Sequence, residues 1–221
     1  MLQAIIFDFD GLMVETEASI FNAASSVFRR FGAELTLQTW QKVVGGRLNG
    51  FDWYDQLEQD LGRPVDRDTL RAEVQQQHHA VANTLPAQPG VIEYIDEAGA
   101  RGLKLGVASS SSRWWVTGHL ERLDLMQHFD AVMTSDDVTH TKPEPDLYHA
   151  ALAALDVAPT NAFAIEDSPN GVTAAQAAGL FCVAVPNEVT SGMPLEHADL
   201  RLESLADLPL AELIARFEAR G

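Results

Sequence analysis

A short apolar stretch near the start of the chain, Ala4-Ile5-Ile6-Phe7, runs directly into Asp8, and Asp10 and Gly11 follow. Such a run is typical of a strand that is buried on both faces, as in a parallel sheet. Ligands of open α/β sheets bind beyond the carboxyl ends of the strands, so the two aspartates stand where chemistry is expected. Taken alone, the same residues also fit a strand that ends in a simple turn.

The rest of the chain divides into two regions by its expected elements. Between residues 15 and 86 no strand pattern occurs, and apolar spacing predicts helices over 19–31, 37–44, 51–61 and 67–84. Beyond residue 86, helices alternate with strands predicted over 104–108, 131–134, 162–165, 181–185 and 199–202. This alternation is typical of right-handed βαβ units and a mostly parallel sheet. We therefore expect a discontinuous α/β core of residues 1–14 and 87–221, with an all-helical domain of residues 15–86 inserted after the first strand.

Composition narrows the classes of partner. The chain has 15 Lys and Arg against 32 Asp and Glu, a net charge of −17 that argues against nucleic acid and anionic membranes as partners. No apolar run approaches the roughly 20 residues of a membrane span, and no basic segment precedes the first apolar stretch, so we expect no membrane segment and no signal peptide. The single cysteine, Cys182, lies in an apolar run and is expected to be buried. We expect a cytoplasmic protein that acts as a monomer or a weak dimer.

Polar residues follow three further predicted strands at their carboxyl ends. These residues are Ser109 and Ser110, Lys142, and Glu166 and Asp167. Because the carboxyl ends of parallel strands meet at one edge of the sheet, we expect these side chains to lie beside Asp8 and Asp10.

This combination of side chains suits phosphoryl transfer. Carboxylate oxygens of Asp8, Asp167 and Glu166 are the ligands that Mg²⁺ prefers, and Lys142 would offset the remaining charge. Asp8 would then act as a nucleophile, and Asp10 would protonate the leaving oxygen and later deprotonate water. Two carboxylates are needed because a nucleophile must be ionised, whereas an acid must be protonated.

Each of these motifs has a simpler explanation. The run of serines from Ser109 fits a polar loop with a helix cap, and Lys142 fits a solvated loop lysine. Glu166 and Asp167, followed by Ser168 and Pro169, fit capping of the next helix. Their joint occurrence, each at the end of a predicted strand, favours a functional site.

In four motifs the chain resembles the haloacid dehalogenase-like hydrolase superfamily, in particular its β-phosphoglucomutase-like phosphatase branch with a helical cap. The motifs are Asp8-Phe9-Asp10-Gly11, Val107-Ala108-Ser109-Ser110, Lys142-Pro143-Glu144-Pro145-Asp146 and Glu166-Asp167-Ser168-Pro169-Asn170-Gly171. The resemblance implies a Rossmann-like parallel-sheet core with residues 15–86 as the cap. It also implies a Mg²⁺-dependent phosphatase that hydrolyses a small phosphorylated metabolite, a sugar phosphate, through an aspartyl-phosphate intermediate.

The resemblance further implies a role for each catalytic residue. Asp8 would be the nucleophile and a Mg²⁺ ligand, and Asp10 the general acid and base with its backbone carbonyl on the metal. Ser109 would bind the transferring phosphoryl group. Lys142 would stabilise both that group and Asp8.

The same resemblance extends to the metal and the substrate. Asp167 would bind Mg²⁺, and Glu166 would bind it directly or through water. Ser110 near the phosphoryl group, and Gly46 and Arg47 in a loop of the cap, are expected to contact the substrate.

Two alternative functions remain open at this point. The β-phosphoglucomutases of this family carry a histidine a few residues into the first cap helix, where this chain has Ile20, so a phosphomutase is the second choice. A phospho-accepting signalling protein also uses an aspartate, an acidic pair, a hydroxyl and a lysine, but such proteins lack a large helical insert. The presence of Asp10 argues for phosphoryl transfer rather than dehalogenation.

Two adjacent pairs of residues are assigned no role in the site. His78 and His79 lie in a polar run and are expected on a solvated helix face. Adjacent tryptophans point to different sides of a helix, so at most one of Trp114 and Trp115 is expected in the core, and the other could line the entrance of the site.

Overall fold

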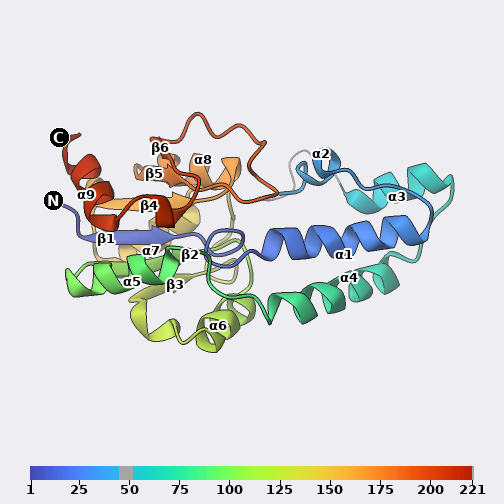
Figure 1. The fold of residues 1–221 in the computed structure, drawn as a ribbon, viewed down its shortest axis with the longest axis horizontal. Helices are drawn as coiled ribbons and strands as arrows, with labels where there is room; N and C mark the ends of the chain where they lie inside the picture. Colours follow the sequence, from blue (N-terminus) through green and yellow to red (C-terminus); the bar gives the residue numbers. More distant parts are fainter. Residues whose placement is uncertain (45–51, 221) are drawn as a thin grey trace.

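The fold is built around one parallel sheet. The computed structural model describes residues 1–44 and 52–220. Within them, six strands pair in the order β3-β2-β1-β4-β5-β6, and every pairing is parallel (Figure 1). The strands are β1 (Ala4–Phe7), β2 (Lys104–Ala108), β3 (Ala131–Met133), β4 (Ala162–Glu166), β5 (Phe181–Ala184) and β6 (Leu200–Arg201). The α/β parallel-sheet fold expected from the alternating pattern is thus confirmed.

Helices cover both faces of this sheet. On one face, Ile5 and Phe7 pack in a cluster with α5 (Val91–Ala100), α6 (Arg113–Arg122) and α9 (Leu210–Glu218). On the other face, Ala4 and Ile6 pack with α7 (Asp146–Leu155) and α8 (Pro169–Ala177). Short 3₁₀ helices are η2 (Met126–His128), η3 (Pro159–Asn161) and η4 (Leu205–Asp207). Successive residues of β1 therefore serve two different cores, which is why its sequence is apolar without alternation.

Within the described residues, four helices lie between β1 and α5 in the chain and extend to one side of the sheet (Figure 1). They are α1 (Thr16–Arg30), α2 (Leu37–Trp40), α3 (Trp53–Leu61) and α4 (Arg67–Ala82). These inserted helices pack around a hydrophobic cluster that includes Phe28 and Leu57, both fully buried. The predicted domain boundaries at residues 14/15 and 86/87 stay a prediction.

Two of the predicted helix ends differ from the structure by three residues or more. Helix α1 begins at Thr16 rather than at Ser19, because the Glu15 side chain accepts a hydrogen bond from the backbone N–H of Ala18 and caps an extra turn. The predicted helix over 37–44 is wrong at its end, since α2 stops at Trp40 and turns follow. The β-branched pair at 43–44 favours helix poorly, which accounts for the early end.

Contacts at several places hold the inserted helices to the sheet region, and two of them join segments that are far apart in the chain. At the first, Gln88 donates from its backbone N–H to the carbonyl of Met13 at 2.8 Å and from Nε2 to Glu15 Oε2 at 3.3 Å, so the two chain crossings are bonded to each other. At the second, Val189 enters the hydrophobic cluster of the inserted helices, where it is 1% exposed. The Gln41 side chain donates to the carbonyl of Val189 at 2.7 Å.

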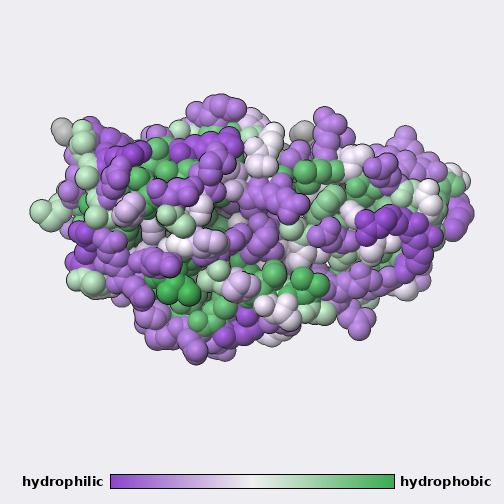
Figure 2. Space-filling model, viewed as in Figure 1, coloured by the Kyte–Doolittle hydropathy of each residue, from purple (hydrophilic) through white to green (hydrophobic). Residues whose placement is uncertain are grey.

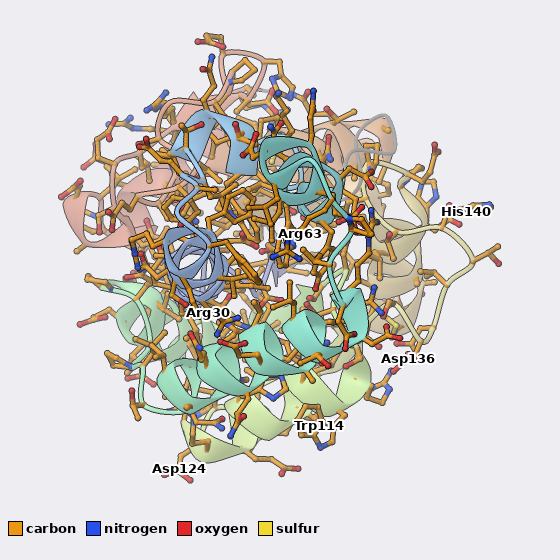
Figure 3. The ribbon with its side chains drawn as sticks, turned by 90° about the vertical axis from the view of Figure 1, so that its right-hand side faces the viewer. Arg30, Arg63, Trp114, Asp124, Asp136 and His140 are labelled. Atoms are coloured by element: carbon orange, nitrogen blue, oxygen red, sulfur yellow. The ribbon has the colours of Figure 1, made fainter. Side chains whose placement is uncertain are left out.

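The adjacent tryptophans separate as expected. Trp115 is buried in α6, whereas Trp114 is 71% exposed. In Figure 3, which looks onto the end formed by the inserted helices, Trp114 lies where α6 meets α4. Its ring approaches that of His79 to 5.8 Å between centroids.

The visible surface is largely hydrophilic. On the face shown in Figure 2, hydrophilic side chains cover most of the area, and hydrophobic ones appear as patches between them. No helix in the described ranges has the length and apolar character needed to cross a membrane. The Cys182 thiol is buried, as predicted.

Removing the Phe28 side chain tests the packing of the inserted helices. Phe28 is fully buried and its ring lies 6.0 Å from that of Trp53. We expect Phe28→Ala to lower the free energy of unfolding by about 3–5 kcal/mol, because it removes buried area and leaves a cavity. Urea denaturation measures the change. Val81→Ala, at a side chain that is 48% exposed in α4, is the matched control; equal losses in the two variants would contradict the packing described.

Candidate active site

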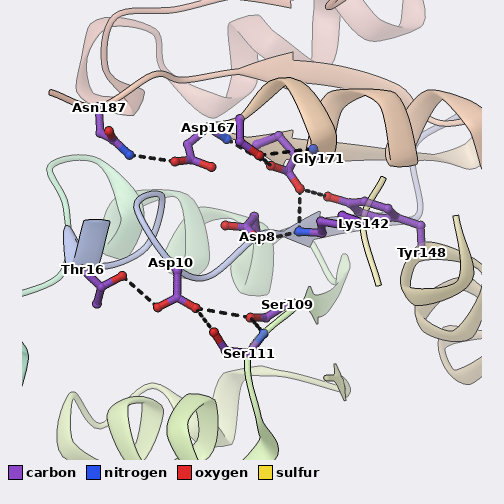
Figure 4. Close-up of polar contacts among 12 residues, drawn as sticks. Asp8, Asp10, Thr16, Ser109, Ser111, Lys142, Tyr148, Asp167, Gly171 and Asn187 are labelled. Atoms are coloured by element: carbon purple, nitrogen blue, oxygen red, sulfur yellow. Dashed lines mark hydrogen bonds and ion pairs between the residues drawn. The ribbon is translucent and has the colours of Figure 1, made fainter. Parts of the chain in front are cut away.

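A buried group of charges lies at the carboxyl end of β1. Lys142 donates from Nζ to Asp8 Oδ1, and the same Nζ lies 2.6 Å from Glu166 Oε1 (Figure 4). The Tyr148 hydroxyl donates to Glu166 Oε1 at 2.5 Å. All three charged residues are at most 7% exposed. The sequence prediction that Lys142 meets Asp8 at the edge of the sheet agrees with this geometry.

Burial dominates the electrostatics of this group. Burial raises the pKa of Asp8 to about 8, although the nearby ammonium of Lys142 acts in the opposite direction. Burial together with the charges of Asp8 and Glu166 also raises the pKa of Asp167 well above its usual range. Burial alone would lower the pKa of Lys142, but the same two carboxylates outweigh it and raise that pKa. The group therefore holds more carboxylates than one lysine neutralises.

Two glycines make room for these carboxyl groups. A Cβ atom at Gly171 would lie 1.9 Å from Glu166 Oε2. A Cβ atom at Gly11 would lie 2.4 Å from both Asp167 Oδ2 and Asn187 Nδ2, and Gly11 has a φ of 82°. Only glycine fits at these two positions, which explains why each follows an acidic motif.

Asp167 has a partner that the sequence analysis did not identify. Asn187 donates from Nδ2 to Asp167 Oδ2 at 2.7 Å and to the carbonyl of Gly11 at 3.2 Å. Its Oδ1 accepts hydrogen bonds from the backbone N–H groups of Val189 and Thr190, which fixes the amide orientation. Asn187 follows the fifth strand. Its position near the carboxyl end of a strand was the feature of the sequence that could have indicated a place in the site.

Asp10 lies beside the buried group and is held on both of its oxygens. Thr16 Oγ1 and Trp115 Nε1 each donate to Oδ1 at 2.8 Å. Ser111 Oγ donates to Oδ2 at 2.6 Å, and Ser109 Oγ lies 3.4 Å from the same oxygen (Figure 4). Ser109 thus reaches Asp10 as the strand order predicts, whereas the contacts of Ser111, Thr16 and Trp115 were not foreseen.

The carboxyl groups form a set that fits a divalent cation. One oxygen each from Asp8, Glu166 and Asp167 lies within 4.8 Å of the others. Hard oxygen donors with excess negative charge suit Mg²⁺. Both oxygens of Glu166 already have partners, because Lys142 and Tyr148 lie at Oε1 while the Asp167 N–H and Ser168 Oγ donate to Oε2. Asp8 and Asp167 are therefore the better placed ligands.

A cavity of about 350 Å³ opens beside this group. Its lining includes predicted site residues and several that were not predicted. The predicted ones are Asp8, Asp10, Ser109, Ser110, Lys142 and Asp167, and the others are Thr16, Glu17, Ile20, Val43, Val44, His78, Ser111, Trp115, Thr141 and Ser168. Ser110 is an exposed residue in this lining. The predicted substrate contacts Gly46 and Arg47 lie outside the described residues.

The expectation of a solvated face is wrong for His78. This residue is 8% exposed, its ring stacks on Trp115 at 4.9 Å, and its Nδ1 lies 2.7 Å from Ser19 Oγ. Burial lowers the pKa of His78 to about 4, so the ring is neutral near pH 7. The polar run around His78 concealed its burial, because its contacts are with Ser19 of α1 and Trp115 of α6, both far from it in the sequence.

A second cavity of about 380 Å³ lies among the inserted helices. Glu17, Ile20 and Val43 line both cavities, so the two adjoin. The remaining lining of the second cavity is aromatic and polar apart from Val74, and comprises Trp40, Asp52, Trp53, Tyr54, Arg71, Val74 and Gln75. Burial, with a contribution from Asp10, raises the pKa of Glu17 to about 8.

Comparisons with known proteins identify the family. A family model described as haloacid dehalogenase-like hydrolase matches residues 5–185. The chain is 40% identical to YhcW of Bacillus subtilis (strain 168), provisionally named a phosphatase, over the whole of both chains. It is 29% identical to hexitol phosphatase B of Escherichia coli (strain K12), with 96% of each chain covered.

A solved structure supports the same assignment. The crystal structure of a Thermotoga maritima protein, provisionally assigned as a β-phosphoglucomutase, is similar with a TM-score of 0.78 and 26% identity. The match covers 96% of this chain and 99% of that one. The chain therefore belongs to the haloacid dehalogenase-like hydrolases, in their β-phosphoglucomutase-like branch, and is a phosphoric monoester hydrolase.

Proposed function

We propose that this phosphatase hydrolyses a phosphorylated carbohydrate with the help of Mg²⁺ and through an aspartyl-phosphate intermediate. The observation that carries the proposal is the arrangement of Asp8 and Asp10. Asp8 is buried against Lys142, whereas Asp10 is bonded to hydroxyl and indole groups at the same cavity. Two carboxyl groups in such different environments suit a nucleophile and an acid.

In the first half of the reaction, Asp8 attacks phosphorus and the ester P–O bond breaks. Asp10 gives its proton to the departing oxygen, so that a neutral alcohol leaves. Lys142 and Ser109 lie close enough to Asp8 and Asp10 to bind the oxygens of the transferring group.

In the second half, water attacks the phosphorus of the aspartyl phosphate. Asp10, now ionised, takes a proton from that water, and the bond between Asp8 and phosphorus breaks. Inorganic phosphate leaves, and both carboxyl groups return to their starting states.

Asp8 and Asp167 would hold the Mg²⁺ ion, together with the backbone carbonyl of Asp10 and with Glu166 directly or through water. Bound there, the ion neutralises carboxylate and phosphoryl charge. The close approach of three carboxylate oxygens supports this ligand set. Asn187 would orient Asp167 toward it.

The nature of the leaving group is suggested by the second cavity and by the relatives. Aromatic side chains such as Trp40 and Trp53, with Asp52 and Gln75 beside them, offer stacking surfaces and hydrogen bonds for a polyhydroxylated group. The names of hexitol phosphatase B and of the β-phosphoglucomutase-like structure agree with a sugar phosphate. The inserted helices would thus act as a cap domain of residues 15–86 that selects the substrate.

Phosphate release with and without Mg²⁺ tests the proposed function directly. The substrates are a panel of sugar phosphates, nucleotides and p-nitrophenyl phosphate. We expect release with Mg²⁺ and background rates in EDTA, with a sugar phosphate preferred. Absence of release from every substrate would favour a phosphomutase, tested by isomerisation of hexose 1-phosphates, or a signalling protein with a stable aspartyl phosphate.

Asp8→Asn tests the nucleophile. The amide keeps the shape of the side chain but cannot attack phosphorus, so we expect phosphate release to fall to background. Because Lys142 keeps Glu166 as a partner, we expect the variant to stay folded, with a circular dichroism spectrum like that of the wild type. Asp60→Asn, at an exposed residue in α3, is the control and should leave turnover unchanged. Near-normal activity of Asp8→Asn would exclude the proposed mechanism.

Asp10→Asn tests the acid and base. An amide can neither give nor take the required proton, so we expect turnover to fall by about 10²- to 10⁴-fold. Rapid-quench measurement of the phosphorylated enzyme should show that both its formation and its hydrolysis are slowed. A variant that keeps the full rate of either half would remove Asp10 from that step.

A further inference from the structure

Trp115 makes a contact with Asp10 that the family motifs do not contain. It is 9% exposed in α6, and its Nε1 donates to Asp10 Oδ1 at 2.8 Å. Thr16 Oγ1 donates to the same oxygen. An indole N–H can donate but never accept, and a carboxylate oxygen accepts through two lone pairs. Oδ1 is therefore fixed as an acceptor with two donors.

The other oxygen of Asp10 has different partners. Oδ2 lies 2.6 Å from Ser111 Oγ and 3.4 Å from Ser109 Oγ. A hydroxyl can either donate or accept, so these partners tolerate a proton on Oδ2. A proton on Oδ1, by contrast, would face the N–H of Trp115. A protonated Asp10 accordingly carries its proton on Oδ2, on the side of Ser109.

The indole ring is held from both the sheet region and the inserted helices. His78 of α4 stacks on it at 4.9 Å with an interplanar angle of 30°. His119 of α6 meets it edge-on at 4.3 Å with an angle of 69°. His78 is itself bonded through Nδ1 to Ser19 Oγ of α1 at 2.7 Å. Rings packed in this way fix the direction of the indole N–H.

We infer that Trp115 is a positioning residue, whose N–H reserves Oδ1 of Asp10 as an acceptor and so directs the catalytic proton to Oδ2. This inference rests on the proposed function. As Asp8 bonds to phosphorus and the ester P–O bond breaks, the proton moves from Oδ2 to the ester oxygen. The products of the step are a neutral alcohol, an aspartyl phosphate and ionised Asp10.

Leaving-group dependence distinguishes this role from a structural one. Trp115→Phe keeps an aromatic ring for His78 and removes the N–H. p-Nitrophenolate is a good leaving group and departs without being protonated. The alkoxide released from glycerol 2-phosphate is a poor leaving group and needs a proton from a general acid. We expect kcat/KM to fall by about tenfold or more for glycerol 2-phosphate, the size of effect for one hydrogen bond to a charged group. For p-nitrophenyl phosphate we expect a change of about twofold or less.

Three further variants sharpen the test. Trp114→Phe, the matched control at the exposed neighbour, should change neither rate. Trp115→His returns a ring N–H near the indole position and should recover part of the loss with glycerol 2-phosphate. In an Asp10→Asn background, Trp115→Phe should cause no additional loss, because its effect passes through Asp10.

The outcomes separate the inference from the proposed function. Equal losses for the two esters, or a full additional loss in the Asp10→Asn background, would overturn the role of Trp115 while leaving the phosphatase intact. A wild-type enzyme that releases no phosphate from either ester would instead overturn the proposed function. Should Trp115→Phe fail to fold, Thr16→Val removes the other donor to Oδ1; a loss independent of the leaving group in that variant would refute the assignment of Oδ1.

Discussion

Burial of uncompensated charge is the constraint on which the site depends. Asp8, Glu166 and Asp167 lie at the carboxyl end of the sheet with a single ammonium, that of Lys142, among them, and all four are at most 7% exposed. A buried ion pair that loses one partner costs on the order of 3–5 kcal/mol, so such a group persists only with its partners in place. The hydrogen bonds from Tyr148 and Asn187, and the space left by two glycines, are parts of that compensation.

This constraint also explains why Asp8 and Asp10 suit different roles in the proposed reaction. Asp8 belongs to the charged group, whereas Asp10 is partly buried and contacts neutral donors from the loop after β2, from α1 and from α6. The two side chains are separated by one residue in sequence, and Gly11 turns the chain immediately after them. The end of β1 thus places one carboxyl group among charged side chains and the next one among neutral hydrogen-bond donors.

The sequence predicted the sheet and the charged group well, because both follow from strong local patterns. The predicted ranges located all six strands to within two residues, and the acidic, basic and hydroxyl residues that follow several of them meet at one edge, as a parallel sheet requires. His78, Trp115 and Asn187 were missed for the opposite reason. Their roles depend on contacts between elements far apart in the chain, and neither a polar run nor an aromatic pair reveals its partners. The end of α2 was misplaced because apolar spacing alone does not register the low helix propensity of adjacent valines.

The segment after β5 connects the two parts of the molecule more closely than the order of elements suggests. Asn187 bonds to Asp167, while Val189, two residues later, is buried in the cluster of the inserted helices and bonded to Gln41. The inserted helices are therefore not an autonomous module on a self-sufficient base. A chimaera that exchanged only residues 15–86 with those of a relative would leave Val189 facing a foreign surface and would disturb the support of Asp167. An exchange of the inserted helices between such enzymes would therefore have to include the segment around Val189, because residues from both stretches of chain form the same hydrophobic cluster.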